Sequence, residues 1–475
     1  MRAYHPRVQV FNTLGRRKEE LIPRRDGEIG IYACGATVQS APHLGHGRMA
    51  VVFDVIRRYL EWRGFRVTFV TNITDIEDKI IAQANRRGIT PAEVAEEATA
   101  QFLDGYRRLG VRDPDHMPRA TDHVASMIDL VARLVAAGHA YAADGDVYFA
   151  VRSFPDYGKL SGRNLDDLLA GARVEPGEQK RDPLDFALWK AAKPGEPSWP
   201  SPWGPGRPGW HIECSVMAAR YLGSGFDIHG GGQDLIFPHH ENEIAQSEAV
   251  DGALFARYWL HNGLLNLSGE KMAKSTGLVV GLLDALERYP AVAVRLFYLR
   301  SRYREPFDFT EEGIEDAIAQ LDRLWAFRRR AGDPTGSEPD PGTLTGFREA
   351  MDDDFNTAGA LGVLFEAVRA GNRRLDAGED AAAIAAAYDE VVAVLGIAEP
   401  AAGLGDLGEE LVALGDRFGV PAGDGPEPVL EGLIARREAA RSARDWATAD
   451  AIRDALEAAG VVVEDTADGA RWHRG

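Results

Sequence analysis

At 475 residues, the chain is long enough for roughly two to four domains with large buried cores. Its apolar content of 45% and charged content of 27% are ordinary for a soluble globular protein, and no uncharged apolar run is long enough to span a membrane. The net charge of -19 argues against nucleic-acid binding by bulk charge and leaves only local basic surfaces for that role.

The N-terminal part of the chain predicts a βαβ unit. Residues 29–34 are typical of a buried strand, residues 44–62 of an amphipathic helix and residues 65–72 of a second strand, with another helix near 76–87. Strand, glycine-containing loop, helix and strand in this order form one unit of a parallel sheet. A nucleotide would then bind at the carboxyl ends of the strands.

The middle of the chain predicts an interruption of this sheet. Residues 91–138 have a helical pattern, and residues 139–208 form a turn-rich insertion that ends in a stretch rich in Pro, Gly and Trp. Strand patterns return around 225–235 and 259–267. We therefore expect a nucleotide-binding fold that is interrupted and then completed.

The rest of the chain predicts helical domains and a small tail. Helical patterns over 283–330 and 344–396 are separated by a linker over 331–343 that is rich in Pro, Gly, Ser and Asp. Residues 398–427 are predicted to be loose because they are rich in Gly, Pro and Ala. The tail is predicted to contain a helix pair over 428–459 and a short strand over 461–465.

Together these patterns predict an α/β fold. It consists of a Rossmann-type parallel-sheet domain split by an insertion, then a helical bundle, then a small C-terminal α+β tail domain. The expected boundaries are 1–120 and 209–270 for the two halves of the sheet domain, 121–208 for the connective insertion, 271–330 for a loop and its following helices, 331–397 for the helical bundle, and 398–475 for the linker and tail domain.

The chain has only two cysteines, Cys34 and Cys214, and each lies among other chemically capable side chains. His239 and Glu243 follow Cys214, and their spacing of four places imidazole and carboxylate on one face of a helix. Two thiolates, an imidazole and a carboxylate make a four-ligand shell that favours zinc over calcium or magnesium. The alternative is two buried, inert cysteines beside a solvated helix face. Lone cysteines without a secretory signal also predict a reducing cytoplasm.

His43 and His46 lie where the first predicted strand passes into its helix. A helix N-terminus attracts phosphate through its unpaired amides and its dipole, and the two imidazoles can donate to phosphoryl oxygens. Gly45 would let a flat base approach the backbone closely. The alternative is a helix that starts after a proline and carries two capping or surface histidines.

Three further segments could lie at the nucleotide-binding crevice. Lys271 and Lys274, in the sequence KMAKS, could clamp the charge of a triphosphate as pyrophosphate leaves, although a lone motif of this kind is most often a surface loop. Glycines 230–232 before Asp234 suit a backbone that approaches a ribose, or else a plain turn. Residues 72–75 end the second strand and would face the same crevice, or cap the next helix.

These motifs jointly resemble the bacterial cysteinyl-tRNA synthetases, class I enzymes with HIGH and KMSKS signatures, and the resemblance runs the whole length of the chain. HLGH (43–46) is similar to HIGH and KMAKS (271–275) to KMSKS. GRPGWHIECS and FPHHENE are the most specific strings. Further similar strings are NITDIEDKI (72–80), YGKLSGR (157–163), DFALWK (185–190), DDDFNT (352–357) and ARDWATADAIRDAL (443–456).

The resemblance implies a class I catalytic domain, a DALR-type helical bundle and an anticodon-binding tail in a cytoplasmic monomer. It implies ATP-dependent activation of L-cysteine to cysteinyl adenylate, with Mg²⁺, and transfer to the 3'-terminal adenosine of tRNA(Cys). One zinc ion per chain would hold the substrate as a thiolate. Because cysteine and serine differ by one atom, a soft metal separates them better than pocket shape, so no editing domain is needed.

The resemblance also implies roles for individual residues. The implied catalytic residues are His43, His46, Lys271 and Lys274. ATP binding is implied for His43, Gly45, His46, Gly230, Gly231, Asp234 and Lys274. Contacts with the substrate cysteine are implied for Gly35, Thr37, Thr74, Trp210 and His239, and zinc ligation for Cys34, Cys214, His239 and Glu243. Contacts with tRNA are implied for Arg436, Arg437, Arg441 and Trp472.

The chain departs from the family pattern at a few positions. Many relatives have Pro, Tyr and Asp where this chain has Ala36, Gln39 and Ser40, and serine where it has Ala273. Since both lysines of the KMAKS loop remain, we expect the loss of that hydroxyl to change only the rate.

Two other functions fit parts of the pattern. The ligase of the mycothiol pathway, which joins activated cysteine to a glucosamine-inositol amine, has a similar core but lacks a tail like residues 428–475. A non-catalytic paralogue that binds zinc and tRNA would not need the intact residues His43, His46, Lys271 and Lys274.

Overall fold

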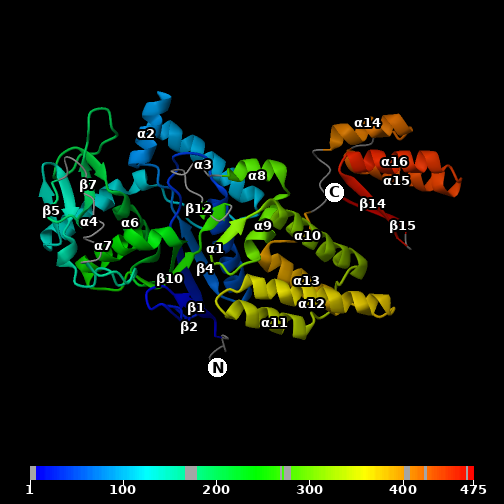
Figure 1. Cartoon of the computed structure of the whole chain (residues 1–475), viewed down its shortest axis with the longest axis horizontal. Helices are drawn as coiled ribbons and strands as arrows, with labels where there is room; N and C mark the ends of the chain where they lie inside the picture. Colours follow the sequence, from blue (N-terminus) through cyan, green and yellow to red (C-terminus); the bar gives the residue numbers. More distant parts are fainter. Residues whose placement is uncertain are drawn as a thin grey trace. The chain divides into compact units, whose positions relative to one another are not determined.

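The structure is a computed structural model, and it describes residues 7–165, 179–267, 270–271, 280–400, 407–421, 425–466 and 469–474. The chain divides into two units, Met1–Ala398 and Glu399–Gly475, each with its own internal contacts (Figure 1). In the described ranges no helix combines the length and the apolar content that a membrane crossing requires.

A four-stranded parallel sheet lies at the centre of the first unit. Its strands are β3 (Glu28–Ala33), β4 (Arg66–Thr71), β9 (Phe226–Gly232) and β10 (Ala256–Asn262), in the order β10-β9-β3-β4. Helix α1 (Leu44–Trp62) connects β3 to β4, which pair in parallel, so the predicted βαβ unit is confirmed. Helices cover the sheet, and most residues of its strands are therefore buried.

The strand order reverses at β3, because β4 follows on one side and β9 pairs on the other. Ligands of open parallel sheets bind at such a point, beyond the carboxyl ends of the strands. Cys34 directly follows β3 and Asn72 directly follows β4, so both lie at this edge. The amide N–H of Cys34 donates to the carbonyl of Gly230 over 2.9 Å.

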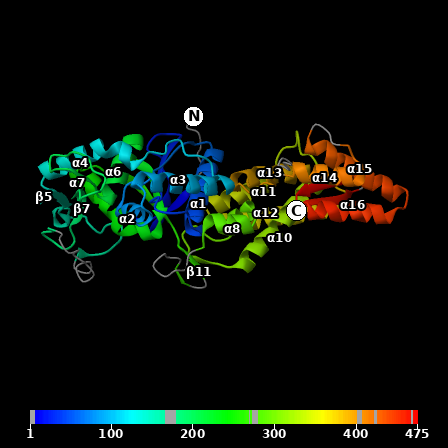
Figure 2. The same cartoon turned by 90° about the horizontal axis from the view of Figure 1, so that it is seen from above.

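The insertion contains a second sheet that the sequence patterns did not predict. It is antiparallel, in the order β5-β6-β7-β8, and its strands are only three to six residues long. Such short strands between Gly and Pro turns show too little alternation to be recognised. The strands are β5 (Ala140–Ala143), β6 (Asp146–Phe149), β7 (Phe186–Ala191) and β8 (Gly206–Pro208). Figure 2 shows β5 and β7 at the end of the first unit that lies away from the helical bundle.

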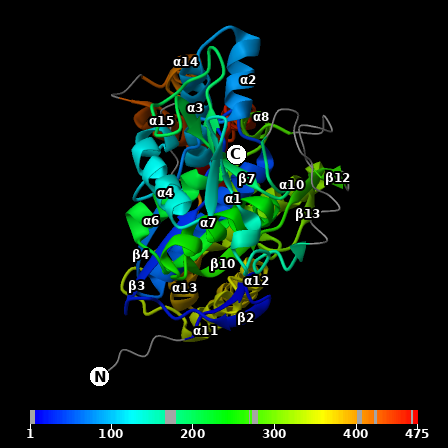
Figure 3. The same ribbon diagram turned by 90° about the vertical axis from the view of Figure 1, so that its left-hand side faces the viewer.

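Helices surround the two sheets of the first unit. Helices α6 and α7 contact each other and lie side by side in Figure 3, which brings together two segments that carry candidate site residues. The helices before the bundle are α2 (Asp78–Arg87), α3 (Pro91–Arg108), α4 (Val124–Ala136), α6 (Trp210–Leu222), α7 (Glu241–Asp251) and α8 (Leu282–Arg288).

Two small groups of paired strands differ from the predicted strands. The second return of strand pattern, expected over 259–267, is divided: β10 ends at Asn262, and β11 (Leu265–Leu267) pairs in a separate sheet with β12 (Glu270–Lys271) and β13 (Phe307–Phe309). An N-terminal hairpin of β1 (Gln9–Asn12) and β2 (Arg17–Glu20) was not predicted.

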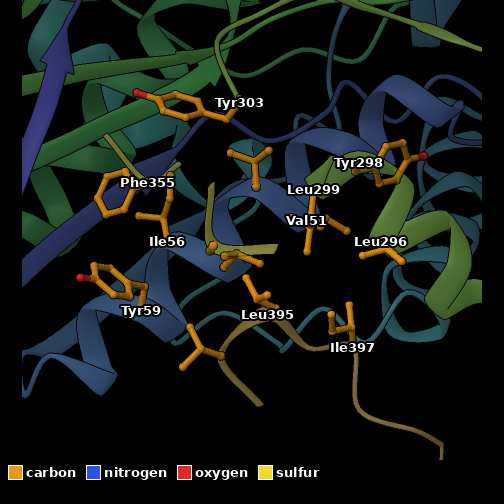
Figure 4. Close-up of a cluster of buried hydrophobic side chains, with 14 of the residues drawn as sticks. Val51, Ile56, Tyr59, Leu296, Tyr298, Leu299, Tyr303, Phe355, Leu395 and Ile397 are labelled. Atoms are coloured by element: carbon orange, nitrogen blue, oxygen red, sulfur yellow. The ribbon is translucent and has the colours of Figure 1, made fainter. Parts of the chain in front are cut away.

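Helix α1 is shared between the sheet and the helical bundle. Its apolar face packs against α9 (Ala291–Leu299) and against residues of the bundle, as Figure 4 shows. This core contains Val51, Ile56, Tyr59, Leu296, Leu299, Phe355, Leu395 and Ile397, all almost completely buried. The bundle consists of α10 (Glu311–Ala331), α11 (Pro341–Asp352), α12 (Thr357–Asp376) and α13 (Ala382–Leu395).

The second unit has its own small core. The predicted helix pair and strand are confirmed as α15 (Pro426–Ser442), α16 (Trp446–Ala458) and β14 (Val461–Thr466). The sequence patterns missed α14 (Gly408–Phe418), in the segment predicted to be loose, and β15 (Gly469–Arg474), which pairs with β14. Glycine lowers helix propensity and obscured α14, yet a Cβ at Gly415 would lie 2.8 Å from Val429.

Candidate functional site

Four side chains from three separate segments form a buried cluster. Cys34 follows β3, Cys214 lies in α6, His239 lies in the short helical turn Ile236–His240 that leads into α7, and Glu243 lies in the first turn of α7. The Sγ atom of Cys34 is 3.4 Å from Sγ of Cys214 and 3.4 Å from Oε1 of Glu243, which is 3.1 Å from Nε2 of His239. These four atoms all lie within 4.8 Å of one another, and each residue is at most 2% exposed.

The cluster has the dimensions of a zinc site. Zn–S bonds of about 2.3 Å and Zn–N or Zn–O bonds of about 2.0–2.2 Å place tetrahedral ligand atoms about 3.3–3.8 Å apart. A second group, Cys34, His229, His240 and Glu243, also lies within 4.8 Å. It offers only one sulfur, and His229 Nε2 already faces the other carboxylate oxygen of Glu243 at 2.8 Å. We therefore treat His229 as a partner of that carboxylate.

Burial favours the neutral forms of the side chains in this cluster. Burial raises the pKa of the Cys34 thiol well above its ordinary value, with a further contribution from the neighbouring Cys214, and burial also raises the pKa of Cys214. The pKa of His239 is lowered well below its ordinary value, chiefly by burial. A divalent cation reverses this preference for the neutral thiols, because it binds the thiolates directly.

A set of aromatic rings holds His239 in place. The indole of Trp210 stacks on the His239 ring at 4.2 Å between centroids, and Nδ1 of His211 lies 2.9 Å from Nδ1 of His239. Burial lowers the pKa of His211 to about 3, so this pair is neutral and shares one hydrogen. With that hydrogen on Nδ1 of His239, its Nε2 presents a lone pair to the cluster. The sequence analysis did not identify His211 or His229.

The residues expected to contact the substrate cysteine lie beside this cluster. The backbone beyond β3 and the backbone beyond β4 pair through Thr37 and Thr74, and the Val38 amide donates to the Thr74 carbonyl over 3.2 Å. A Cβ at Gly35 would lie 1.7 Å from the Asn72 carbonyl oxygen, so only glycine allows this approach. The structure thus brings Gly35, Thr37 and Thr74 together.

The two histidines of HLGH lie at the N-terminus of α1. Their rings stack with centroids 3.7 Å apart, and the amide N–H of His43 donates to Nδ1 of His46 over 3.1 Å. The Leu44 amide donates to the Val280 carbonyl over 3.2 Å, and the Leu282 amide to the Pro42 carbonyl over 2.9 Å. The segment that follows KMAKS is therefore anchored at the start of α1.

The structure describes only part of the KMAKS segment. Lys271 ends β12, but Lys274 and Ala273 lie outside the described residues, as does the side chain of Lys271. The segment before the loop pairs with β11 through β12, and the segment after it accepts a hydrogen bond at Val280 from the Leu44 amide.

The glycines of β9 have a packing role. A Cβ at Gly230 would lie 2.2 Å from the Phe53 ring of α1, and a Cβ at Gly231 would lie 2.8 Å from the His240 ring. Larger residues are thus excluded at both positions by the close approach of α1 and of the His240 segment. Asp234 is exposed just beyond the end of β9, where a ligand in the crevice could reach it.

The four residues expected to contact tRNA differ in exposure. Arg437 is 5% exposed and binds both carboxylate oxygens of Asp465, over 2.7 and 2.9 Å, so it holds α15 against β14. Arg441 pairs with the same carboxylate. Trp472 packs against the small core, whereas Arg436 is exposed. The geometry gives Arg437 and Trp472 structural roles and leaves Arg436 and the half-exposed Arg441 at the surface.

Three family models match successive parts of the chain. They are described as the tRNA synthetases class I (C) catalytic domain, over residues 20–319, the DALR domain, over 346–399, and the cysteinyl-tRNA ligase anticodon binding domain, over 426–472. The first model alone covers more than half of the chain.

Curated relatives match over almost the whole length. Proteins named cysteine–tRNA ligase from Geobacter sulfurreducens and Halorhodospira halophila are each 49% identical, over 98% of this chain and 99% of theirs. A protein of the same name from Alkalilimnicola ehrlichii is 50% identical, over 98% of this chain and 100% of its own.

Solved structures with a similar fold have much lower sequence identity. Mycobacterium tuberculosis methionyl-tRNA synthetase in complex with methionyl-adenylate is 18% identical, with a TM-score of 0.56, over 78% of this chain and 90% of that one. A putative arginyl tRNA synthetase from Campylobacter jejuni is 11% identical, with a TM-score of 0.51, over 78% and 93%. At such low identity these similarities show a shared fold alone.

Proposed function

The chain belongs to the family of cysteine–tRNA ligases, and from this premise we propose how its residues carry out the reaction. The enzyme joins L-cysteine to tRNA(Cys) in two steps. A carboxylate oxygen of cysteine attacks the α-phosphate of ATP, which forms cysteinyl adenylate and releases pyrophosphate. A hydroxyl of the terminal adenosine of tRNA then takes the cysteinyl group and AMP leaves.

The two alternatives drawn from the sequence are not favoured. Residues 426–472 match the anticodon binding domain of the cysteinyl-tRNA ligases, a domain that an enzyme acting on a small amine would not require. The curated relatives that cover 98% of the chain are named as ligases, which also disfavours a paralogue that only binds.

We assign the triphosphate to the N-terminus of α1. There the stacked imidazoles of His43 and His46 lie at the positive end of the helix dipole, an arrangement that attracts phosphoryl oxygens. Lys271 and Lys274 would approach from the loop whose return segment is anchored beside His43. Their contribution is to place charge where it develops as pyrophosphate leaves.

We assign the substrate cysteine to a substrate pocket around Gly35, Thr37, Thr74 and Trp210, the expected contact residues beside the buried cluster. Cys34, Cys214, His239 and Glu243 would hold a zinc ion there. The ion would supply a Lewis-acid contact that selects sulfur over the hydroxyl of serine. The neutral pair of His211 and His239 keeps Nε2 directed at the cluster, and Trp210 covers the His239 ring.

The observation that carries this proposal is the convergence of the four ligands from three distant segments of the chain. The test combines metal analysis with two transfer assays on one purified sample. We expect about one zinc per chain, cysteine-dependent ATP–pyrophosphate exchange, and transfer of cysteine to tRNA(Cys) but not to the glucosamine-inositol amine. Folded protein that binds zinc but shows no exchange would instead support a binding protein.

We also propose that the enzyme acts as a monomer in the cytoplasm, where ATP and tRNA meet. Light scattering at micromolar concentration gives the mass in solution, and a value near 51.8 kDa is expected. Twice that mass would contradict the monomer.

A further inference from the structure

One buried amide connects the parts of the site, and the family resemblance did not identify it. Asn72 follows β4 and is 1% exposed. Its Oδ1 accepts hydrogen bonds from the Gly35 amide over 2.8 Å and from the Tyr32 hydroxyl over 3.0 Å. Its Nδ2 donates to Oγ1 of Thr74 over 3.1 Å, and Sγ of Cys214 lies 3.8 Å from Oδ1.

The chemistry of the partners fixes which way the amide faces. A backbone N–H only donates, so the Asn72 atom opposite Gly35 has to be the carbonyl oxygen. Both lone pairs of that oxygen are then used, one by Gly35 and one by Tyr32. The NH₂ group consequently faces Thr74, and the opposite orientation of the amide would set this NH₂ group against the Gly35 N–H, which also donates.

Each partner of Asn72 adjoins a different element of the cysteine site. Gly35 follows the ligand Cys34, and Tyr32 precedes it by two residues on β3. Thr74 is 1% exposed and pairs with Thr37 in the substrate pocket. The bond from Asn72 uses one lone pair of the Thr74 hydroxyl and so restricts the direction in which this hydroxyl faces.

We propose that Asn72 is a positioning residue that determines cysteine selectivity. It aligns the Cys34 backbone and the Thr74 hydroxyl with each other, so that the metal ligands and the substrate pocket keep one geometry. The role rests on the proposed function, since it concerns the cysteine half of the site. Within the described part of the chain, the hydrogen-bond partners of Asn72 lie around Cys34 and Thr74 and not around His43, so we place its role in the cysteine half.

The main test is Asn72→Ala with kinetics that separate the two substrates. We expect KM for cysteine to rise about tenfold or more, because three buried partners lose their hydrogen bonds, while KM for ATP stays within about twofold. Discrimination against serine in the exchange assay should fall in parallel. Equal changes in both KM values, or none, would overturn the proposal.

Asn72→Asp separates the two functions of the amide. It keeps an acceptor for Gly35 and Tyr32 but replaces the donor to Thr74. In the cobalt(II)-substituted enzyme, we expect thiolate-to-cobalt absorption to be altered in Asn72→Ala and largely retained in Asn72→Asp. KM for cysteine should nevertheless rise in Asn72→Asp. This nearly isosteric variant carries the test if Asn72→Ala does not fold.

A double-mutant cycle with Thr74→Val asks whether Asn72 acts through Thr74. KM for cysteine in the double variant should be no higher than in the more impaired of the two single variants, because the two residues share one hydrogen bond. Strictly additive losses would refute that route.

Asn12→Ala is the matched control. Asn12 is 3% exposed and holds the N-terminal hairpin on β10 through the Trp259 amide and the Arg257 carbonyl, each over 2.9 Å. It should lower thermal stability without changing the ratio of the two KM values or the cobalt spectrum. If it changes both as Asn72→Ala does, the effect of Asn72 is general destabilisation and the proposal fails.

Measurements on the unsubstituted enzyme distinguish a failure of the positioning role from a failure of the proposed function. Absence of thiolate-to-cobalt bands or of cysteine-dependent exchange in that sample would refute the proposed function. Their presence, with unchanged Asn72 variants, would refute the positioning role alone.

Discussion

The two units use polar side chains in contrasting ways. Around Cys34 and Glu243 the polar groups are buried, and their partners come from segments far apart in the chain. In the second unit most charged groups are exposed, and the main ion pair joins Arg437 to Asp465, whose side chain is 43% exposed. Removing one member of a buried network leaves the others unpaired in a low dielectric, whereas water replaces a lost exposed partner. Substitutions of similar size should therefore differ widely in effect.

The largest effect is expected for Cys214→Ser in the buried cluster. A hydroxyl is a poorer zinc ligand than a thiolate, so zinc content should fall and cysteine-dependent exchange should drop about 100-fold or more. Circular dichroism should show a folded protein, and tRNA binding should persist because the second unit is unchanged. Unchanged zinc content would remove Cys214 from the ligand set.

Deletion of residues 399–475 should separate the two units by function. Their cores consist of different residues, so the first unit should remain folded. We expect kcat/KM for tRNA to fall about tenfold or more, while cysteine-dependent exchange stays within about twofold. A parallel loss of both activities would show that the first unit depends on the tail.

Asp465→Asn should have a moderate effect that depends on pH. Hydrogen bonds from Arg437 lower the pKa of Asp465 to about 2, below its unfolded value of about 3.9. Because the folded pKa is the lower one, the stabilisation is present above about pH 4 and is lost as pH falls toward 2. Thermal unfolding of the isolated second unit should show a loss of about 1 kcal/mol at pH 6, allowing for the exposure of the pair.

The difference between Asp465→Asn and the unsubstituted unit should vanish near pH 2. Asp454→Asn is the control, since Asp454 pairs with its exposed neighbour Arg453 and should change stability by less than about 0.5 kcal/mol. A pH-independent difference would mean that packing, and not the charge of Asp465, accounts for the effect.

Arg436→Ala should have the smallest effect. Arg436 is exposed, and a single phosphate contact should weaken tRNA binding a few-fold and reduce the salt dependence by about one unit of slope. Filter binding over a range of salt concentrations measures both. Arg66→Ala, an exposed arginine at the amino end of β4, should leave both unchanged. If the two variants behave alike, Arg436 does not contact tRNA.

The site residues that could be predicted belong to a residue type that is rare in this chain. Those that were missed belong to more common types. Cys34 and Cys214 were recognisable because the chain has no other cysteine. His211 and His229 act through hydrogen bonds to partners that lie 28 and 14 residues away in the chain. No local pattern marks such a partner, so these residues were found only in the folded chain.

The elements whose signal is local could be predicted from the amino-acid sequence. The βαβ unit over β3, α1 and β4, the helical patterns of the bundle, and the α15 and α16 pair follow from periodicities that a dozen residues suffice to show. Only the tertiary structure decided which short strands pair in the insertion and with β14, and which way the Asn72 amide faces. These outcomes depend on burial and on partners distant in the chain, because a buried polar group is stable only where folding brings its complement within hydrogen-bond distance.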